Sequence, residues 1–458
     1  MIENDAFKLL LINLFHLNPN DITNIVCTTF NKMMVLLVTL ADKHQACPYC
    51  GFTAPKIKEY VTKEITHSAL TTQKCIIKYR ARRYKCPCCG KTYYEFNPFV
   101  FKSQKISILT VHNILKDLKD FNETFTSVAR RYHVSPTSVS TIFDNHVDIG
   151  RNPLPEIINF DEVYAFKSEK SKYVCVLLDF KKQIPVDVLP NRKKEYLLNY
   201  FQKIPLEERK KVKYACSDMY EVYRDVVHKV FPEAKHLLDY FHLSQDFHKK
   251  MNEVRIKVMK RYKDDKASDE YYLLKKFNWL LFKNPEDEDK YGRLFDVERE
   301  RKYNSHFKSY MNYYDLRKKI LEINNDLTIC YSLKLELVDF YSKSTIDNAQ
   351  VNLEHLIRSC IDTNIEEMIA FSNNLINWKQ EIINSFTIVG TEYKVEADKG
   401  QVVVCNKKVN NAIIENRNKI IKCIKNNANG YTNWSRFRNR VMYVLDPNAT
   451  FSLEPREK

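Results

Sequence analysis

The chain has 458 residues, of which 44% are hydrophobic, and carries a formal net charge of +16. At roughly 100 to 200 residues per domain this length predicts about two to four domains, and the apolar content excludes a disordered or fibrous chain. The first residues lack a basic segment, and the longest apolar run, 33–41, is too short to span a bilayer. The odd count of 13 cysteines argues against a disulfide framework. We therefore expect a cytoplasmic protein without a membrane segment, whose positive charge would attract a polyanion such as nucleic acid or serve solubility alone.

Near the N-terminus, two CxxC pairs are each followed by glycine, in the segments CPYCG and CPCCG. Two thiolates three positions apart in a tight turn can bind one ion, and a second such turn completes a closed tetrahedral site. The β-rich segments 56–66 and 74–84 are expected to bring the turns together. The pattern predicts a zinc ribbon with one structural Zn²⁺, and the alternative is a set of buried or redox-active cysteines. The expected ligands are Cys47, Cys50, Cys86 and Cys89, whereas Cys75 and Cys88 complete no such turn. His67 is an alternative ligand, although a lone histidine between strands is more often structural.

Basic and aromatic residues are interleaved from 74 to 105, which suits contact with phosphate, sugar and base. A solvated strand face is the other interpretation. Residues 126–147 then read as a helix-turn-helix, with Ser135 as the N-cap and Pro136 in the first turn of the second helix. A plain helical hairpin is the alternative here. Together the segments predict a DNA-binding region that uses Arg80, Arg82, Arg83, Lys85, Arg130, Arg131, Thr137, Ser138 and Ser140.

Beyond residue 155, short strands and helices alternate. The expected strands are 156–160, 173–180, 184–189, 212–216 and 236–238, and the expected helices are 193–203 and 219–231. Three consecutive antiparallel strands followed by α/β crossovers are the sequence of elements in an RNase H-like fold. The segment 239–385 reads as almost wholly helical and is interpreted as an insertion.

The chain is therefore expected to be a multidomain protein with α+β and α/β regions. We expect an N-terminal segment at 1–40, a zinc ribbon at 41–105 and a helix-turn-helix region at 106–150. The RNase H-like catalytic core is expected at 156–242 and 401–445, around a large helical insertion at 243–400, with a tail at 446–458.

Three acids are candidate metal ligands of this core. In the expected sheet the first and fourth strands end side by side, and Asp161 and Asp218 follow these two strands. On a helix expected at 410–427, a turn of about 100° per residue makes Glu415 the only acid on a polar face, opposite an isoleucine stripe. Carboxylate oxygens select hard cations, so two Mg²⁺ ions are expected, with Mn²⁺ as a substitute. The alternative is that these carboxylates cap helices or are solvated.

Other polar residues could support this site. Asp239 and His242 lie near the end of the last strand and could orient water or substrate, or equally form an ion pair at the rim of the core. Lys419 and Lys422 share the helix of Glu415 and are expected to touch DNA. The tail arginines are expected to reach phosphate while Trp434 anchors them, although a solvated basic turn is the alternative; they are Arg436, Arg438 and Arg440.

The two cysteine motifs are followed, in this order, by NFDEVYAF, YVCVLLDF, PNRKKEYL, CSDMYEVY, FPEAKHLLDYFHL and ENRNKIIKCIKNNANGYTNWSRFRNRV. This series is highly specific and resembles transposases of bacterial insertion sequences, those of the L-three family within the DDE class. The resemblance covers most of the chain. At Ala412 and Asn416 the chain departs from many members of the family, which have glycine there.

The resemblance implies a transposase whose N-terminal region binds terminal inverted repeats of double-stranded DNA. It implies Mg²⁺-dependent strand cleavage and transfer to target DNA by Asp161, Asp218 and Glu415, supported by Asp239 and His242. Because two DNA ends are joined, a homodimer or larger assembly is expected. The alternatives are a zinc-dependent DNA-binding regulator derived from a decayed transposase, without catalysis, and a structure-selective nuclease that shares the fold.

Overall fold

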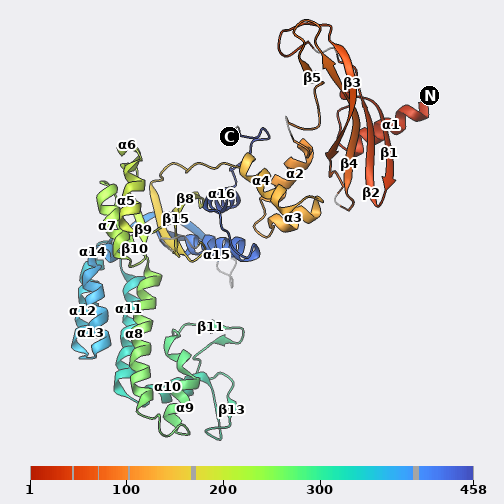
Figure 1. Ribbon diagram of the computed structural model, residues 1–458. Helices are drawn as coiled ribbons and strands as arrows, with labels where there is room; N and C mark the ends of the chain where they lie inside the picture. Colours follow the sequence, from red (N-terminus) through yellow and green to blue (C-terminus); the bar gives the residue numbers. More distant parts are fainter. Residues whose placement is uncertain are drawn as a thin grey trace.

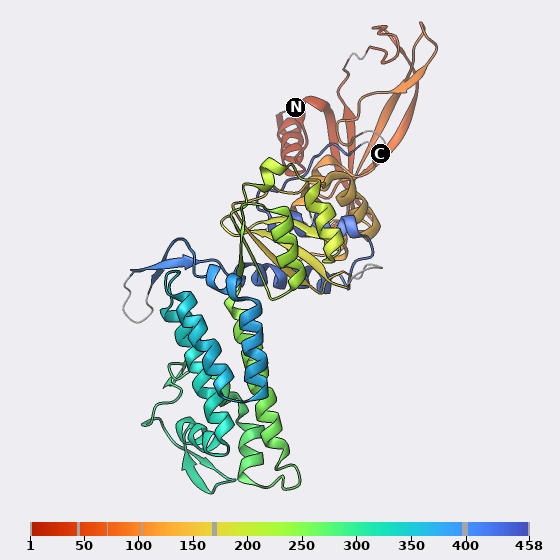
Figure 2. The same ribbon diagram turned by 90° about the vertical axis from the view of Figure 1, so that its left-hand side faces the viewer.

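The computed structural model describes residues 2–43, 46–70, 72–101, 104–166, 172–395 and 402–456. It is a mixed α/β chain with an N-terminal sheet at one end and a bundle of long helices that projects from a central sheet at the other (Figure 1). A view turned by 90° shows the bundle extending away from the central sheet in the same manner (Figure 2). Within the described ranges, no helix is long and apolar enough to cross a membrane.

The N-terminal sheet combines the expected ribbon strands with an earlier hairpin. The strands are β1 (Ile22–Phe30), β2 (Met33–Leu40), β3 (Lys56–Thr66), β4 (Cys75–Lys85) and β5 (Thr92–Tyr94), preceded by α1 (Ile2–Leu14). Their order is β1-β2-β4-β3, with β5 also paired to β4. Phe15, Leu36 and Ile77 lie fully buried in its core. The hairpin and the ribbon strands therefore form one continuous sheet.

Three helices follow, and their caps fit the sequence. They are α2 (Ile108–Asp117), α3 (Phe125–Arg131) and α4 (Pro136–His146). Ser135 is the N-cap of α4, as predicted, and its Oγ accepts a hydrogen bond of 3.0 Å from the Ser138 amide. The apolar faces of the three helices pack together around Val128, Val139 and Phe143.

The central sheet has the order β10-β9-β6-β7-β8. Its antiparallel strands are β6 (Ile157–Val163), β7 (Val174–Asp179) and β8 (Pro185–Leu189), and β9 (Tyr214–Ser217) and β10 (Lys235–Leu238) run parallel to β6. The helices between them are α5 (Lys194–Gln202), α6 (Leu206–Arg209) and α7 (Glu221–Val230). The predicted order of strands and helices is confirmed, including the pairing of the first strand with the fourth.

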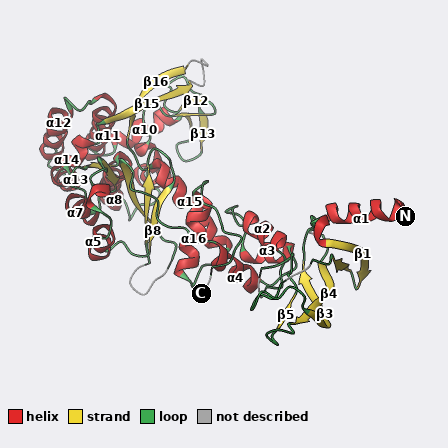
Figure 3. Cartoon of the chain, turned by 90° about the horizontal axis from the view of Figure 1, so that it is seen from above, coloured by secondary structure: helices red, strands yellow, loops and turns green. Residues whose placement is uncertain are grey.

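Alternate residues of β6 face opposite layers, because successive side chains of a strand point to opposite sides. Ile158 and Phe160 pack with residues of α5 and α7. Asn159, Asp161 and Val163 face the other layer, formed by α15 (Ala412–Asn427) and α16 (Trp434–Leu445). Seen from above, α15 and α16 lie between the central sheet and α2 to α4 (Figure 3). This alternation aims Asp161 at α15.

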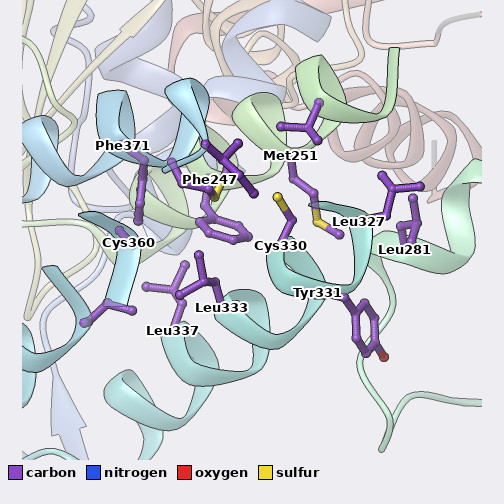
Figure 4. Packing of buried hydrophobic residues seen from close by; sticks show 14 of the residues in the cluster. Phe247, Met251, Leu281, Leu327, Cys330, Tyr331, Leu333, Leu337, Cys360 and Phe371 are labelled. Carbon is purple, nitrogen blue, oxygen red and sulfur yellow. The ribbon is translucent and has the colours of Figure 1, made fainter. Parts of the chain in front are cut away.

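The insertion begins with the long helix α8 (Tyr240–Lys260) and is built mainly from helices. The others are α9 (Asp269–Lys276), the short 3-10 helix η2 (Asn278–Phe282), α10 (Tyr313–Glu322), α11 (Asn325–Lys343), α12 (Ala349–Asp362), α13 (Glu366–Asn377) and α14 (Lys379–Asn384). Phe247, Met251, Leu333 and Phe371 interlock between its helices (Figure 4). The hairpin of β15 (Ile388–Val395) and β16 (Val402–Lys408) then leads back to α15.

The expectation of an almost wholly helical segment 239–385 was wrong between residues 288 and 311. Two short hairpins occupy this stretch, β11 (Glu288–Asp289) with β12 (Gly292–Arg293) and β13 (Lys302–Asn304) with β14 (Ser309–Met311). Gly292 has a φ of +94°, which a tight turn requires and a helix does not permit. Their strand residues are mostly exposed, so the hairpins lack an apolar stripe that sequence periodicity could detect.

Candidate functional site

Four cysteine sulfurs converge at the end of the N-terminal sheet. The Sγ atoms of Cys47 and Cys89 are 3.7 Å apart, and those of Cys50 and Cys86 are 3.5 Å apart. All four sulfurs lie within 4.8 Å of one another. A tetrahedral zinc ion with bonds of about 2.3 Å separates its sulfur ligands by roughly 3.8 Å. The arrangement therefore fits one closed Zn²⁺ site.

The turns that carry these thiols explain the glycine in each motif. Gly51 and Gly90 have φ values of +75° and +72°, and their amides donate hydrogen bonds of 2.9 Å to the carbonyls of Cys47 and Cys86. The amide of Cys89 lowers the pKa of the Cys86 thiol, whereas burial and the neighbouring thiols raise the pKa of Cys50. A bound Zn²⁺ would stabilise the thiolate form of all four cysteines.

The neighbouring candidates lie elsewhere, as the sequence suggested. Cys75 is buried in the sheet and Cys88 is exposed outside the sulfur cluster. His67 is buried, with its ring nitrogens 2.9 Å from Ser107 Oγ and 2.8 Å from the Phe15 carbonyl. His67 therefore has a structural role in joining α1 to the loop before α2.

Asp161 and Asp218 lie on adjacent parallel strands of the central sheet. Asp161 is in β6 and only 8% exposed, and Asp218 follows β9 directly. Asp161 accepts a hydrogen bond of 2.8 Å from the Glu162 amide and another of 2.7 Å from Asn418 Nδ2. Asp218 accepts one of 3.2 Å from the Tyr220 amide. The pairing of β6 with β9 thus brings both carboxyl groups to one end of the sheet.

Burial makes both carboxyl groups reluctant to ionise. It raises the pKa of Asp161 to about 7, with a further upward contribution from the negative charge of Asp218. Burial likewise raises the pKa of Asp218 to about 6, with a contribution from Glu162. A divalent cation bound by these acids would stabilise their ionised forms and so lower the raised pKa values.

Glu415 lies in a second group, with Asp239 and His242. One ligand atom of each of these residues lies within 4.8 Å of the other two. His242 Nε2 is 3.8 Å from Asp239 Oδ2, and neither atom has a hydrogen-bond partner among the residues that the structure describes. Burial raises the pKa of Asp239, and the charge of Glu415 raises it further. Two buried polar atoms that lack partners suit a site completed by a water or an ion.

The two groups are connected through His242 and α15. The charge of His242 lowers the pKa of Asp161, of Asp218 and of Asp239. Asn418, which binds Asp161, is three residues beyond Glu415 on the same helix. The structure therefore brings Asp239, His242 and Glu415 together. Helix α15 links this group to Asp161 through Asn418, and the pairing of β6 with β9 brings Asp218 to the same end of the sheet as Asp161.

The start of α15 is held on β6 by asparagine side chains. Asn159 Nδ2 donates hydrogen bonds of 2.8 Å to the Asn410 carbonyl and 2.7 Å to Asn411 Oδ1. Asn411 Nδ2 donates in turn to the Phe160 carbonyl at 3.3 Å, and the Asn411 amide donates to Asp239 Oδ1 at 3.3 Å. These bonds fix where the helix begins, and thereby where Glu415 lies.

Three residues beside the site were missed by the sequence prediction. Asn418 could have been found, because a spacing of three places it on the face of Glu415. Arg192 forms an ion pair with Glu162, and its guanidinium lies 4.6 Å from the ring centroids of Tyr173 and Tyr220. Arg192 and Glu162 are the other two missed residues. Arg192 belongs to the PNRKKEYL motif, but no local sequence pattern indicates that it pairs with Glu162.

The raised pKa values predict pH-dependent metal binding. Because Asp161 titrates near pH 7 when no metal is bound, protons compete with Mg²⁺ as the pH falls. Affinity for Mg²⁺ should drop by up to about tenfold per pH unit between pH 7 and 5.5 for each proton that the cation displaces. Titration calorimetry in buffers of different ionisation enthalpy measures both affinity and proton release. An Mg²⁺ affinity that does not change between pH 7 and 5.5 would contradict the assignment of Asp161 as a ligand.

The raised pKa of Asp161 also makes the stability of the metal-free protein depend on pH, but in the opposite direction to metal binding. A carboxyl group whose pKa is raised by folding favours the folded state at low pH and loses that contribution as pH rises from 3.8 towards 7. The stabilisation that Mg²⁺ gives should therefore be larger at pH 8 than at pH 5.5.

The predicted DNA-contacting residues divide into exposed and internally paired groups. Arg82 pairs with Glu95 and Arg83 with Glu59, each at 2.7 Å, and Arg131 pairs with Asp117 and Glu123. Ser138 and Ser140 are half-buried and bond within α4, Ser138 to the N-cap Ser135. The exposed members of the set are Arg80, Lys85, Arg130, Thr137, Lys419 and Lys422.

The tail arginines hold α16 in place instead of projecting from it. Arg436 pairs with Asp144 of α4 and Arg438 with Asp187 of β8, each at 2.6 Å. Arg440 is 1% exposed and donates hydrogen bonds to the carbonyls of Asp120 and Glu123. The structure contradicts the expected phosphate contact of Arg440, because α16 is buried between the sheet and α2 to α4.

Comparisons with known proteins agree with this arrangement. The family model DDE_Tnp_ISL3, described as a transposase, matches residues 158–397, more than half of the chain. The transposase for insertion sequence element IS1001 of Bordetella parapertussis is 19% identical over 410 residues, which are 89% of this chain and 90% of that protein. The matched family segment contains Asp161, Asp218, Asp239 and His242 and ends before α15. The resemblance noted in the sequence is thus confirmed, and the chain belongs to the ISL3 family of insertion-sequence transposases.

Proposed function

We propose that the chain binds the terminal inverted repeats of its element and catalyses Mg²⁺-dependent DNA strand cleavage and strand transfer. The observation that carries the proposal is the pair of acids formed by Asp161, buried in β6, and Asp218, half-buried directly after the adjacent parallel strand β9. Asn418 of α15, the helix that carries Glu415, donates a hydrogen bond to Asp161. The strand order β10-β9-β6-β7-β8, with helices on both faces, is the order expected of an RNase H-like catalytic core and supports this reading.

In this proposal Asp161, Asp218 and Glu415 hold the Mg²⁺ ions. Bound Mg²⁺ would activate the attacking hydroxyl and stabilise the leaving oxygen in an in-line displacement at phosphorus. Asn418 and the Glu162 amide fix the two oxygens of Asp161 in orientation. His242, whose Nε2 has no partner among the described residues, is suited to orient a water or a DNA oxygen. Arg192, held by Glu162, supplies a fixed positive charge at the same end of the sheet.

The N-terminal sheet and α2 to α4 form the proposed DNA-recognition region. In this proposal α3 and α4, which are joined by a short turn, act as a helix-turn-helix, and Thr137 is exposed in the first turn of α4. Arg80, Lys85 and Arg130 are exposed cations of the same region. We propose that this region reads the element ends, and that two copies of the chain hold two ends for joining.

Binding of the ends should weaken steeply with salt. If five exposed cations each neutralise one phosphate, the logarithm of the affinity should fall by roughly 4.5 per logarithmic unit of salt. Arg130→Ala should reduce that slope by about 0.9, since one contact is lost. Fluorescence anisotropy with labelled end fragments measures the slope. Lys318→Ala, which removes an exposed cation from the helical insertion, is the matched control. A slope near zero would exclude the basic residues as a DNA surface.

Incubation with a DNA fragment that bears the element ends, followed by mapping of strand breaks, tests the activity itself. The proposal predicts Mg²⁺-dependent breaks at the ends and joined products. Specific binding without any Mg²⁺-dependent product would identify a DNA-binding regulator instead. Hydrolysis of branched DNA without joining would identify a structure-selective nuclease.

A further inference from the structure

A second group of metal-ligating side chains lies where the helical insertion meets the central sheet. It comprises His228 on α7, His236 on β10 and Glu381 on α14, with one ligand atom of each within 4.8 Å of the other two. Glu381 Oε1 is 3.9 Å from His228 Nε2 and 4.0 Å from His236 Nδ1. These distances are too long for hydrogen bonds, so the three side chains converge without bonding to one another.

The hydrogen bonds of Ser217 determine which nitrogen of His236 carries the proton. Ser217 Oγ donates its single proton to the Asp218 carbonyl at 2.8 Å, and it lies 2.9 Å from His236 Nε2. Nε2 must therefore be the donor to Ser217, which leaves Nδ1 as an unprotonated acceptor in the neutral ring. Burial keeps the ring neutral by lowering the pKa of His236 to about 3. The free lone pair of Nδ1 thus points into the group.

That lone pair lacks a partner that the protein could provide. His236 is 1% exposed, and its Nδ1 is buried without a hydrogen-bond partner among the described residues. The group that it faces is the Glu381 carboxylate, another acceptor, whose side chain is 6% exposed. In the part of the chain that the structure describes, this carboxylate receives no hydrogen bond. Two buried acceptors facing one another are unfavourable unless a cation lies between them.

We propose that His228, His236 and Glu381 bind a Zn²⁺ ion, with a fourth position open to water. Two imidazoles and one carboxylate are a ligand set that zinc accepts, and Ser217 supplies the outer hydrogen bond that orients a metal-binding histidine. Zinc bonds of about 2.0 to 2.1 Å separate tetrahedral ligands by roughly 3.3 Å. The His228 side chain is 55% exposed and can rotate to close the remaining gap.

The site joins the catalytic core to the end of the insertion. Helix α14 contacts β10 directly, because Asn384 Nδ2 donates a hydrogen bond of 2.9 Å to the His236 carbonyl. A metal bound to Glu381 and His236 adds a second connection between the same elements. Because His236 also binds Ser217, which contacts the backbone of Asp218, the ion would stiffen the end of β9 where a candidate catalytic carboxylate lies.

Arg224 carries a positive charge that acts on this group. Its positive charge contributes to the lowered pKa of His236 and would repel a cation. Its guanidinium is held over the Trp378 ring, 4.4 Å from the centroid, and donates to the Asn377 carbonyl at 2.9 Å. Those contacts direct the guanidinium to the tryptophan face, while Glu381 supplies the negative charge that a cation needs.

Zinc content of the full chain tests the site separately from the cysteine cluster. Protein reconstituted with Zn²⁺ in millimolar Mg²⁺, which keeps the acidic cluster occupied, is desalted and measured by inductively coupled plasma mass spectrometry. The expected result is two zinc ions per chain for the parent and one for His228→Ala and Glu381→Gln. His355→Ala, which removes an exposed histidine paired with Glu336 at 2.9 Å in the insertion, should retain two.

Both variants are expected to fold, so a loss of zinc reports on the site itself. His228 is at the surface, so His228→Ala leaves the buried core intact, and Glu381→Gln preserves the shape of the buried side chain. Added Zn²⁺ should raise the melting temperature of the parent with a filled cysteine site and leave that of His228→Ala unchanged. A parent that holds one zinc ion, or variants that hold as much zinc as the parent, would overturn the proposal. Neither result depends on transposition activity.

Discussion

Asp161→Asn and Asp218→Asn are each expected to abolish Mg²⁺-dependent strand cleavage, with a loss on the order of 10³-fold or more. A loss of that size corresponds to roughly 4 kcal/mol in the activation barrier. The amide keeps the shape of the carboxyl group but removes the charge that attracts a cation. Asp161 is buried and Asp218 is half-buried, and this burial together with neighbouring negative charges raises the pKa of both, so the acids are suited to binding a cation. Cleavage of end-bearing DNA in single-turnover conditions measures the effect.

The matched control is Asp179→Asn. Asp179 is a buried acid at the other end of β7, where Oδ1 accepts hydrogen bonds from the amides of Lys181 and Lys182. This variant should keep most of the cleavage activity, because its amide oxygen can still accept those bonds. All three variants should bind end fragments with unchanged affinity. Retained cleavage in Asp161→Asn or Asp218→Asn would remove these residues from the catalytic group.

Cys86→Ser is expected to unfold the end of the N-terminal sheet that carries the cysteine turns. Structural zinc contributes roughly 10 to 16 kcal/mol of apparent binding free energy at pH 7, far more than the aromatic pair Tyr84 and Tyr93 beside the site could replace. The variant should lose one zinc ion, become sensitive to proteolysis between residues 46 and 94, and lose end binding. Limited proteolysis with mass spectrometry locates the change.

Cys88→Ser provides the comparison for that variant. Cys88 is exposed and lies between two of the ligands in the chain, yet outside the sulfur cluster. Its replacement should leave zinc content and protease resistance unchanged. A folded, protease-resistant Cys86→Ser protein with no zinc would show that the four thiols are not a structural metal site.

The sequence allowed a close prediction of the central sheet because each strand has a local signal. Residues 157–160 and 174–178 are short, mostly apolar runs, and helices with clear apolar periodicity separate the later strands. The first run was predicted to end the strand at residue 160, whereas β6 continues through Asp161 to Val163. Asp161 and Asp218 were found for the same reason, since each follows such a run. The cysteine turns were predicted because the CxxC spacing and the glycine that follows each pair are what a turn that binds zinc requires.

Other features depend on contacts between distant segments, which local patterns do not encode. The basic pattern of RFRNR predicts solvent contact, but Arg440 is buried because α16 is covered by α2 to α4 on one side and by the sheet on the other. Likewise, His228, His236 and Glu381 come from three elements far apart in the chain. Each looks ordinary by itself, and only the packing of α14 against β10 brings them together.

The position of Glu415 is the least local of the site's features. Helical periodicity places it on the polar face with Asn418, and the asparagine contacts of β6 determine how far α15 extends over the sheet. The structure groups Glu415 with Asp239 and His242, and Asn418 of the same helix donates a hydrogen bond to Asp161. The proposed mechanism requires that Asp161, Asp218 and Glu415 bind the same pair of cations.

Anomalous scattering from Mn²⁺ in crystals of the full chain bound to an end-bearing DNA fragment tests this requirement most directly. We predict two manganese peaks at the end of β6 and β9, held by the carboxylates of Asp161, Asp218 and Glu415. A complex in which the Glu415 carboxylate contacts no ion, or in which Asp161 and Asp218 bind none, would contradict the proposed catalytic site.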